Sequence, residues 1–268
     1  MTLRNLWYFL IQLKANRNLL RNLVLRDLKH RYVGSVGGFF WSVIHPIVLL
    51  VCYYFVLTVV MGVRLGEEYA TQNFALFLFC GILPWLMFQE TVLRNCTAVT
   101  DNASLITKTI IPSEILPMSI MISNLIHHMI GLVILIGALL LFHSVELSVL
   151  WVFAYMPILI LLAQGLGWLV ASLNVFFRDT SQVLTVMMIF WFWFTPIFYP
   201  PEYLPENFQL IMAVNPMATV VSGYRNAFLQ MESPGLEHIL ILLGWTGVTF
   251  LVGALFFRRS KVAFADVL

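Results

Sequence analysis

Residues 176–201 read FFRDTSQVLTVMMIFWFWFTPIFYPP, and the rest of the chain can be interpreted around them. It opens with the charged pair Arg178-Asp179 and continues as an uncharged run over residues 183–199. At about 1.5 Å per residue, a helix of that length just crosses the hydrocarbon core of a membrane. The run is too apolar for the surface of a soluble protein, so it predicts a transmembrane helix.

The middle of this run is a series of consecutive aromatic residues. Successive helical residues turn by about 100°, so Phe190, Trp193 and Phe194 share one stripe, while Trp191 and Phe198 share another. The aromatic residues fit an interfacial belt or packing between helices. They also fit a path on which sugar rings stack, because Trp191 lies at the midpoint of the run, where a belt is not expected. The candidate path residues, with three from the first span, are Trp41, Tyr53, Tyr54, Phe190, Trp191, Trp193 and Phe194.

The composition of the chain indicates an integral membrane protein. Of 268 residues, 60% are hydrophobic and 10% are charged, whereas soluble domains carry about 25% charged residues. The first residues are mixed and basic, so we expect no cleavable signal peptide. The three cysteines lack the spacing of a metal site or a disulfide pair. We expect a single all-α transmembrane domain over residues 1–268.

The apolar runs predict six transmembrane helices. They cover residues 39–62, 74–93, 115–142, 148–175, 183–199 and 239–257. The first contains His45-Pro46, and a proline at this position kinks a helix. The third predicted helix contains Ser123 and His127, four residues apart, which make a polar stripe on one face.

Three further segments lie outside the spans. Residues 5–32 alternate apolar and basic positions, which is typical of a helix lying on an anionic membrane surface, although packing on a protein partner fits equally. Residues 95–113 are polar and then amphipathic, and they form the longest link on their side of the membrane. Residues 200–237 contain two short apolar segments separated by Asn215-Pro216, which predict a re-entrant pair of helices.

The basic residues set the orientation. An even number of spans places both termini on one side, together with thirteen lysines and arginines: Arg4, Lys14, Arg17, Arg21, Arg26, Lys29, Arg31, Arg94, Lys108, Arg178, Arg258, Arg259 and Lys261. Only Arg64 and Arg225 fall on the other side. The positive-inside rule then predicts cytoplasmic termini and an outer re-entrant pair.

The chain lacks several chemical signatures. No stretch matches the P-loop pattern, so we expect ATP and Mg to bind a separate subunit and no cofactor to bind this chain. No catalytic or metal-binding pattern and no nucleic-acid motif appears. His127 and His128 point about 100° apart; a helix–helix hydrogen bond and a functional role both remain open. The acidic residues lie near span ends, which argues against a proton-coupled flippase, and no nucleophile–base pair supports a membrane-embedded transferase.

Several stretches, in order along nearly the whole chain, resemble the membrane subunits of polysaccharide-exporting ABC transporters. These subunits carry O-antigen, teichoic acid or capsule chains. The similar stretches are LRDLKHRY (25–32), GGFFWSVIHP (37–46), SLITKTIIPSEILP (104–117), FFRDTSQVL (176–184), Thr195-Pro196-Ile197, Asn215-Pro216 and Tyr224-Arg225. The chain differs in the unusually aromatic fifth span. Exporters of drugs or small lipids share the architecture and remain the close alternative.

The resemblance implies the assembly and its parts. Two copies of the chain would form the pore in a bacterial inner membrane, each bound to an ATPase subunit, and would move a lipid-linked glycan outward. The segment at residues 104–111 would be the coupling helix, with Ser104, Leu105, Ile106 and Lys108 as its contacts; we expect the apolar pair Leu105-Ile106 to face the ATPase. Asn215, Pro216, Tyr224 and Arg225 would belong to an outer gate. Arg26, Lys29 and Arg31 beside the first span could bind a lipid pyrophosphate, or could serve only as topology anchors.

Overall fold

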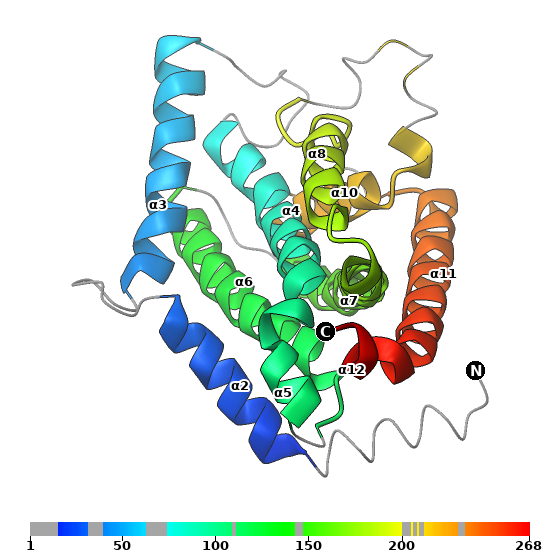
Figure 1. Ribbon diagram of the computed structural model, residues 1–268. Helices are drawn as coiled ribbons and strands as arrows, with labels where there is room; N and C mark the ends of the chain where they lie inside the picture. Colours follow the sequence, from blue (N-terminus) through cyan, green and yellow to red (C-terminus); the bar gives the residue numbers. More distant parts are fainter. Residues whose placement is uncertain are drawn as a thin grey trace.

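A computed structural model describes residues 16–31, 40–62, 74–108, 111–142, 147–199, 205, 208, 212–229 and 234–268. These residues form helices and no strand, which confirms the all-α prediction. The part of the expected surface helix before residue 16, and most of residues 200–211, lie outside the described residues. Apolar helices surround α4, with α2, α5 and α12 gathered at one end of the bundle and α8 and α10 toward the other (Figure 1).

Five helical stretches are long and apolar enough to cross a membrane. The first joins α3 (Trp41–Tyr53) to the π-helix η2 (Tyr54–Val60). The next two are α4 (Phe74–Thr97) and α6 (Ile115–Phe142). The fourth joins the 3-10 helix η4 (Leu147–Trp151) to α7 (Val152–Phe176), and the last contains α11 (Leu236–Ser260).

The expected fifth span is not among these five. It corresponds to α8 (Thr180–Trp193), which has 14 residues and is therefore about 21 Å long. A hydrocarbon core is about 30 Å thick. The helix ends before Thr195-Pro196 because a residue that precedes proline is disfavoured in α conformation. The sequence run stays apolar to Tyr199, so hydropathy alone overestimates the length of this helix.

The core of the molecule forms around α4. This helix packs against α6, α7, α8 and α10 (Pro216–Leu229), and its rings Phe77, Trp85 and Phe88 are fully buried. On the far side of α7, α11 approaches so closely that a Cβ on Gly253 would lie 1.9 Å from the carbonyl oxygen of Gly165. Small residues at such a crossing let two membrane helices pack backbone to backbone.

The amphipathic helix, α5 and the C-terminal helices gather at one end of the bundle. The amphipathic helix α2 (Arg17–His30) packs along α6. After α4, the 3-10 helix η3 (Thr100–Asn102) leads into α5 (Ala103–Lys108). The chain ends in η6 (Lys261–Ala263) and α12 (Phe264–Val267), which packs on α5. Figure 1 shows the C-terminus beside α5.

Candidate functional site

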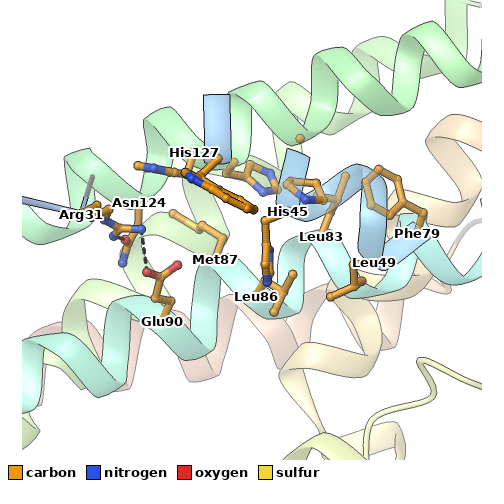
Figure 2. Close-up of a pocket in the computed structure, with 14 residues that line it drawn as sticks. Arg31, His45, Leu49, Phe79, Leu83, Leu86, Met87, Glu90, Asn124 and His127 are labelled. Atoms are coloured by element: carbon orange, nitrogen blue, oxygen red, sulfur yellow. Dashed lines mark hydrogen bonds and ion pairs between the residues drawn. The ribbon is translucent and has the colours of Figure 1, made fainter. Parts of the chain in front are cut away.

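A cavity of about 450 Å³ lies between α3, α4 and α6, close to the end of α2. Arg31, Glu90 and Asn124 cluster at one end of it, and Leu49 and Phe79 lie at the other (Figure 2). The cavity is therefore amphipathic along its length. A site of this size, mostly apolar with a few convergent polar groups, has the general properties of a ligand-binding pocket.

The polar end of the cavity is a network that joins three helices. Arg31 Nη1 lies 2.7 Å from Glu90 Oε1, and its Nε lies 3.6 Å from Asp27 Oδ2. Arg94 donates to both carboxylate oxygens of Asp27, and its Nη1 also donates to Asn124 Oδ1 at 3.3 Å. Arg31 donates to the same Asn124 oxygen. Side chains of α2, α4 and α6 thus lock the surface helix onto the bundle.

The Asp27 carboxylate is stabilised in its charged form. Burial by itself raises its pKa, but hydrogen bonds from Arg94 and the positive charges of Arg94 and Arg31 outweigh burial and hold the pKa below its ordinary value. Asp27 therefore stays ionised at neutral pH. Two cations and two anions, Arg31, Arg94, Asp27 and Glu90, then sum to no net charge.

The two adjacent histidines of α6 have different surroundings. His127 Nδ1 lies 2.9 Å from the carbonyl oxygen of Ser123 in the same helix; because a carbonyl only accepts, this nitrogen carries the proton. His127 and His45 lie on the wall of the cavity between its polar and apolar ends (Figure 2). His128 is buried, and its Nε2 lies 2.9 Å from Tyr224 Oη on α10. For His128 the structure thus contains a helix–helix hydrogen bond.

The aromatic residues of α8 divide into two groups, as their helical positions indicate. Trp191 is half-buried; its ring centroid lies 5.1 Å from that of Phe88, and its Nε1 donates to Asn215 Oδ1 at 2.9 Å. The other stripe faces outward, with Phe190 63%, Trp193 60% and Phe194 45% exposed. Trp191 thus packs within the bundle, and the opposite stripe is available to lipid or to a partner.

The aromatic candidates of the first span lie along α3 and η2. Trp41 and Tyr54 are exposed, and Trp41 lines the cavity. Tyr53 is half-buried, with its ring centroid 5.5 Å from that of Phe198 in an edge-on arrangement. The structure therefore does not gather the aromatic candidates around one cavity within a single copy of the chain.

The Asn215-Pro216 pair holds the irregular backbone that follows α8. The Nδ2 of Asn215 donates to the carbonyl oxygen of Phe194 at 3.0 Å and to Thr195 Oγ1 at 3.1 Å. Its Oδ1 accepts from the backbone N–H of Met217 at 3.0 Å, so the same side chain caps α10. Pro216 is the first residue of α10, where its missing N–H costs nothing.

Arg225 completes this support from within α10. It is 2% exposed, its Nη2 donates to the carbonyl oxygen of Ile197 at 2.7 Å, and its guanidinium carbon lies 3.6 Å from the centre of the Phe77 ring. A backbone carbonyl thus provides the polar partner that this buried guanidinium needs. Backbone groups outside a helix must find such partners at membrane depth.

The short helix α5 is fixed by apolar contacts on its inner side. Leu105 and Ile106 are half-buried and pack against Ile115, Leu116 and neighbouring apolar residues of the bundle. Both side chains therefore have apolar contacts within the chain itself, because apolar side chains of a short helix pack against a neighbouring apolar surface. Ser104 and Lys108 are exposed, so the free surface of α5 is polar.

The C-terminal segment supports α5 from a second direction. Lys261 Nζ lies 2.5 Å from Glu114 Oε1, and Phe264 is fully buried beside Val99 and Phe257. Ile106 packs against this cluster as well. The residues of α5 therefore share apolar clusters with both α2 and the end of α11.

Among the residues that the structure describes, no three histidine, cysteine or acidic side chains come together as a metal site. The three basic candidates for binding a lipid pyrophosphate differ in their exposure and contacts. Lys29 is exposed, and exposed Arg26 donates to Asn102 Oδ1 at 2.9 Å. Arg31 is held in the cavity network.

These features define a multi-pass helical membrane protein with an internal cavity and a braced short helix between two spans. A family model described as ABC-2 type transporter matches residues 18–229. The chain belongs to this family. It is therefore a transport subunit, the membrane component of an ABC transporter, and that class of transporter uses a nucleotide-binding partner.

Curated relatives match the chain from end to end. An O-antigen export system permease protein, RfbA, from Myxococcus xanthus is 29% identical over 261 residues, covering 95% of this chain and 97% of its own length. An RfbA protein from Klebsiella pneumoniae is also 29% identical, over 266 residues, covering 96% and 99%. The polysialic acid transport protein KpsM from Escherichia coli is 20% identical over 246 residues, covering 90% and 93%.

Sequence reasoning missed the network at the polar end of the cavity. Asp27, Arg94 and Asn124 were not singled out, because each stands alone in its own stretch and the partners are far apart along the chain. The sequence contains one indication of this network. Asp27 lies among basic residues of an amphipathic helix, and an acid at such a position needs a cationic partner.

Proposed function

We propose that the chain is the permease subunit of an ATP-driven exporter that moves a polysaccharide outward across the bacterial inner membrane. The observation that carries this proposal is the end-to-end similarity to proteins named as O-antigen export permeases. The names of those proteins give O-antigen as what is exported, and we propose a lipid-linked glycan of the O-antigen type as the substrate of this chain. The ATP would be hydrolysed by two copies of a separate subunit, with two copies of this chain forming the pore.

The geometry of α5 supports coupling to such an ATPase. The exposed residues Ser104 and Lys108 present a polar surface, while Leu105 and Ile106 fasten the helix to the bundle. A partner that pushes on the polar surface would move α2, α6 and the C-terminal segment together. Docking on this surface uses no apolar patch, which suits an interface that rearranges during each cycle of ATP hydrolysis.

We propose six crossings, with α8 and the irregular residues 194–199 making the fifth. Asn215 and Arg225 satisfy carbonyl groups of this irregular stretch, as a broken helix at membrane depth requires. Both termini and α5 would then be cytoplasmic, and α10 would be part of an outer gate. Cysteines introduced at Ser104 and Glu237 test this topology: they should react with impermeant thiol reagents from opposite sides of the membrane. Labelling of both from one side would leave only five crossings.

For the lipid pyrophosphate, the structure favours Arg26 and Lys29 over Arg31. The first two are exposed on α2, whereas Arg31 already contacts Glu90, Asp27 and Asn124. Trp193 and its outward stripe on α8 would face the glycan path at the contact between two copies. Trp41 and Tyr54 on α3 and η2 would extend that path along the first span.

The proposed function is tested by export in cells. A strain lacking this chain should accumulate the polymer inside, and wild-type chain supplied with its ATPase should restore surface polymer. Export should stop when the ATPase carries a substitution in its P-loop lysine, and should continue when the proton gradient is collapsed at constant ATP. Export that depends on the proton gradient alone would overturn the proposal.

A further inference from the structure

The cavity between α3, α4 and α6 contains an accessible carboxylate at its polar end. In the Arg31–Glu90 pair the carboxylate side chain is 42% exposed and the guanidinium side chain 17%. Glu90 therefore offers hydrogen-bond acceptors to the cavity, while Nη1 and Nη2 of Arg31 already contact Glu90 and Asn124. Ligand hydroxyl groups, which donate, would match these acceptors.

The charge of this end of the cavity argues against an anionic ligand. Arg31 and Arg94 are balanced by Asp27 and Glu90, so the network has no surplus positive charge. A phosphate or carboxylate group placed here would meet the exposed Glu90 carboxylate first, and like charges in close contact repel. A neutral ligand rich in hydroxyl groups avoids this repulsion.

The remaining walls suit the faces of a sugar ring and an attached apolar chain. Trp41, half-exposed on α3, and His45, one turn further along, supply flat surfaces for C–H faces. Beyond them Leu49, Phe79 and Leu83 form the apolar end (Figure 2). The volume of about 450 Å³ lies within the range of pockets for ligands of this size.

We propose that this cavity, inside a single copy of the chain, binds a neutral sugar ring of an amphiphilic glycan. Glu90 binds its hydroxyl groups, and Trp41 stacks on its face. This inference rests on the proposed function for the source of the ligand, and it assigns the cavity a role separate from the outward stripe of α8. His128 also lines the cavity and bonds to Tyr224, so an occupied cavity contacts a helix that supports the outer gate.

The experiment uses the full chain, with its ATPase where that co-purifies, in detergent-free lipid nanodiscs. Calorimetric titration compares four single-chain probes below their micelle concentrations: octyl glucoside, octyl phosphate, octanoylglycerol and octanol. We expect octyl glucoside to bind about tenfold more tightly than each of the others, the effect of one good hydrogen bond or ring contact. Equal binding of octanol would mean a purely apolar cavity. Equal binding of octanoylglycerol would identify a membrane lipid, and tighter binding of octyl phosphate an anionic one; each of these results overturns the proposal.

Variants assign the binding to this cavity. Trp41→Leu should weaken octyl glucoside binding about tenfold, whereas Trp245→Leu, an exposed tryptophan on α11, should leave it unchanged. Glu90→Gln should weaken the glucoside and strengthen octyl phosphate, since the network then gains a net positive charge. Unchanged glucoside binding in Trp41→Leu would overturn the proposal even if Glu90→Gln proved poorly folded. Because no ATPase activity or polymer is needed, failure here would leave the proposed export function standing.

Discussion

Helices α3 and α4 are both long apolar segments, yet they have opposite surroundings. In α4, 78% of the residues of the most apolar window are buried, whereas in the span formed by α3 and η2 none is. The more apolar of the two is the less buried. In a membrane, lipid accepts apolar surface as readily as a protein core does, so hydropathy identifies a span without showing which face is packed.

Composition within α4 shows why it is the central helix. It contains the buried polar residues Thr91 and Asn95 and the glycine Gly81. An alanine at Gly81 would bring a Cβ within 3.1 Å of the Arg225 guanidinium. Polar and small residues mark surfaces that face protein, because polar groups need partners in the membrane and small residues permit close approach. The exposed side of the span formed by α3 and η2 instead carries Val48, Val51 and Phe55.

The largest expected effect is the difference in stability between two tryptophan truncations, one in α4 and one in α3. Trp85→Ala in α4 removes a fully buried ring and should cost about 3–5 kcal/mol of stability. Trp41→Ala in α3 should change stability by less than about 0.5 kcal/mol. Thermal unfolding in detergent can be followed with a thiol-reactive dye, since Cys80 is buried and Cys52 is exposed. Equal losses in the two variants would contradict the contrast between the helices.

A second test makes the same comparison within one helix. Gly253→Ala on α11 places a methyl group against the Gly165 carbonyl and should cost about 1–3 kcal/mol. On the lipid-facing side, Gly247→Ala has nothing within 4 Å of the new Cβ and should be neutral or stabilising by up to about 1 kcal/mol. The readout is the same dye assay. A Gly253→Ala variant as stable as the wild type would contradict the close packing of α11 on α7.

A third test concerns the ionic attachment of α2. Asp27→Asn should destabilise the chain by about 1–2 kcal/mol near neutral pH, because it weakens hydrogen bonds from Arg94. The folded-state pKa of Asp27 is lowered, so its contribution is present above the unfolded pKa and disappears as pH falls through the folded pKa, below about pH 4. The wild type and the variant should therefore converge in acid. The exposed Asp179→Asn variant is the control and should follow the wild type at every pH.

The smallest effect on stability, and the most specific on function, is expected at α5. Lys108→Glu reverses an exposed charge and should reduce ATPase association about tenfold with little change in stability. Arg259→Glu, at the exposed end of α11, is the charge-matched control. Ile106→Asp should instead destabilise the bundle, because Ile106 packs inward. If Ile106→Asp folds and loses the ATPase while Lys108→Glu keeps it, the apolar pair Leu105-Ile106 lies at the ATPase interface.

The sequence predicts the spans well and their partners poorly. Apolar runs located five membrane-length helices, because lipid exposure leaves a signal in every residue of a span. The sequence does not show where α8 ends, since its apolar run continues through a break that is stabilised by Asn215 and Arg225. Asp27 and Arg94 are 67 positions apart, and the contact of Phe264 with Val99 joins the C-terminus to the α4–α5 link. Such pairings depend on how helices assemble, which one sequence does not encode locally.

Purification of the complex is the sharpest test of whether the chain is the permease of an ATP-driven exporter. The chain is tagged, expressed with the genes beside it and purified in mild detergent, and the subunits are quantified. We predict that an ATPase subunit co-purifies in equal amount and that Lys108→Glu, but not Arg259→Glu, releases it. A folded wild-type chain that carries no ATPase under these conditions would contradict the proposal that it is the permease of an ATP-driven exporter.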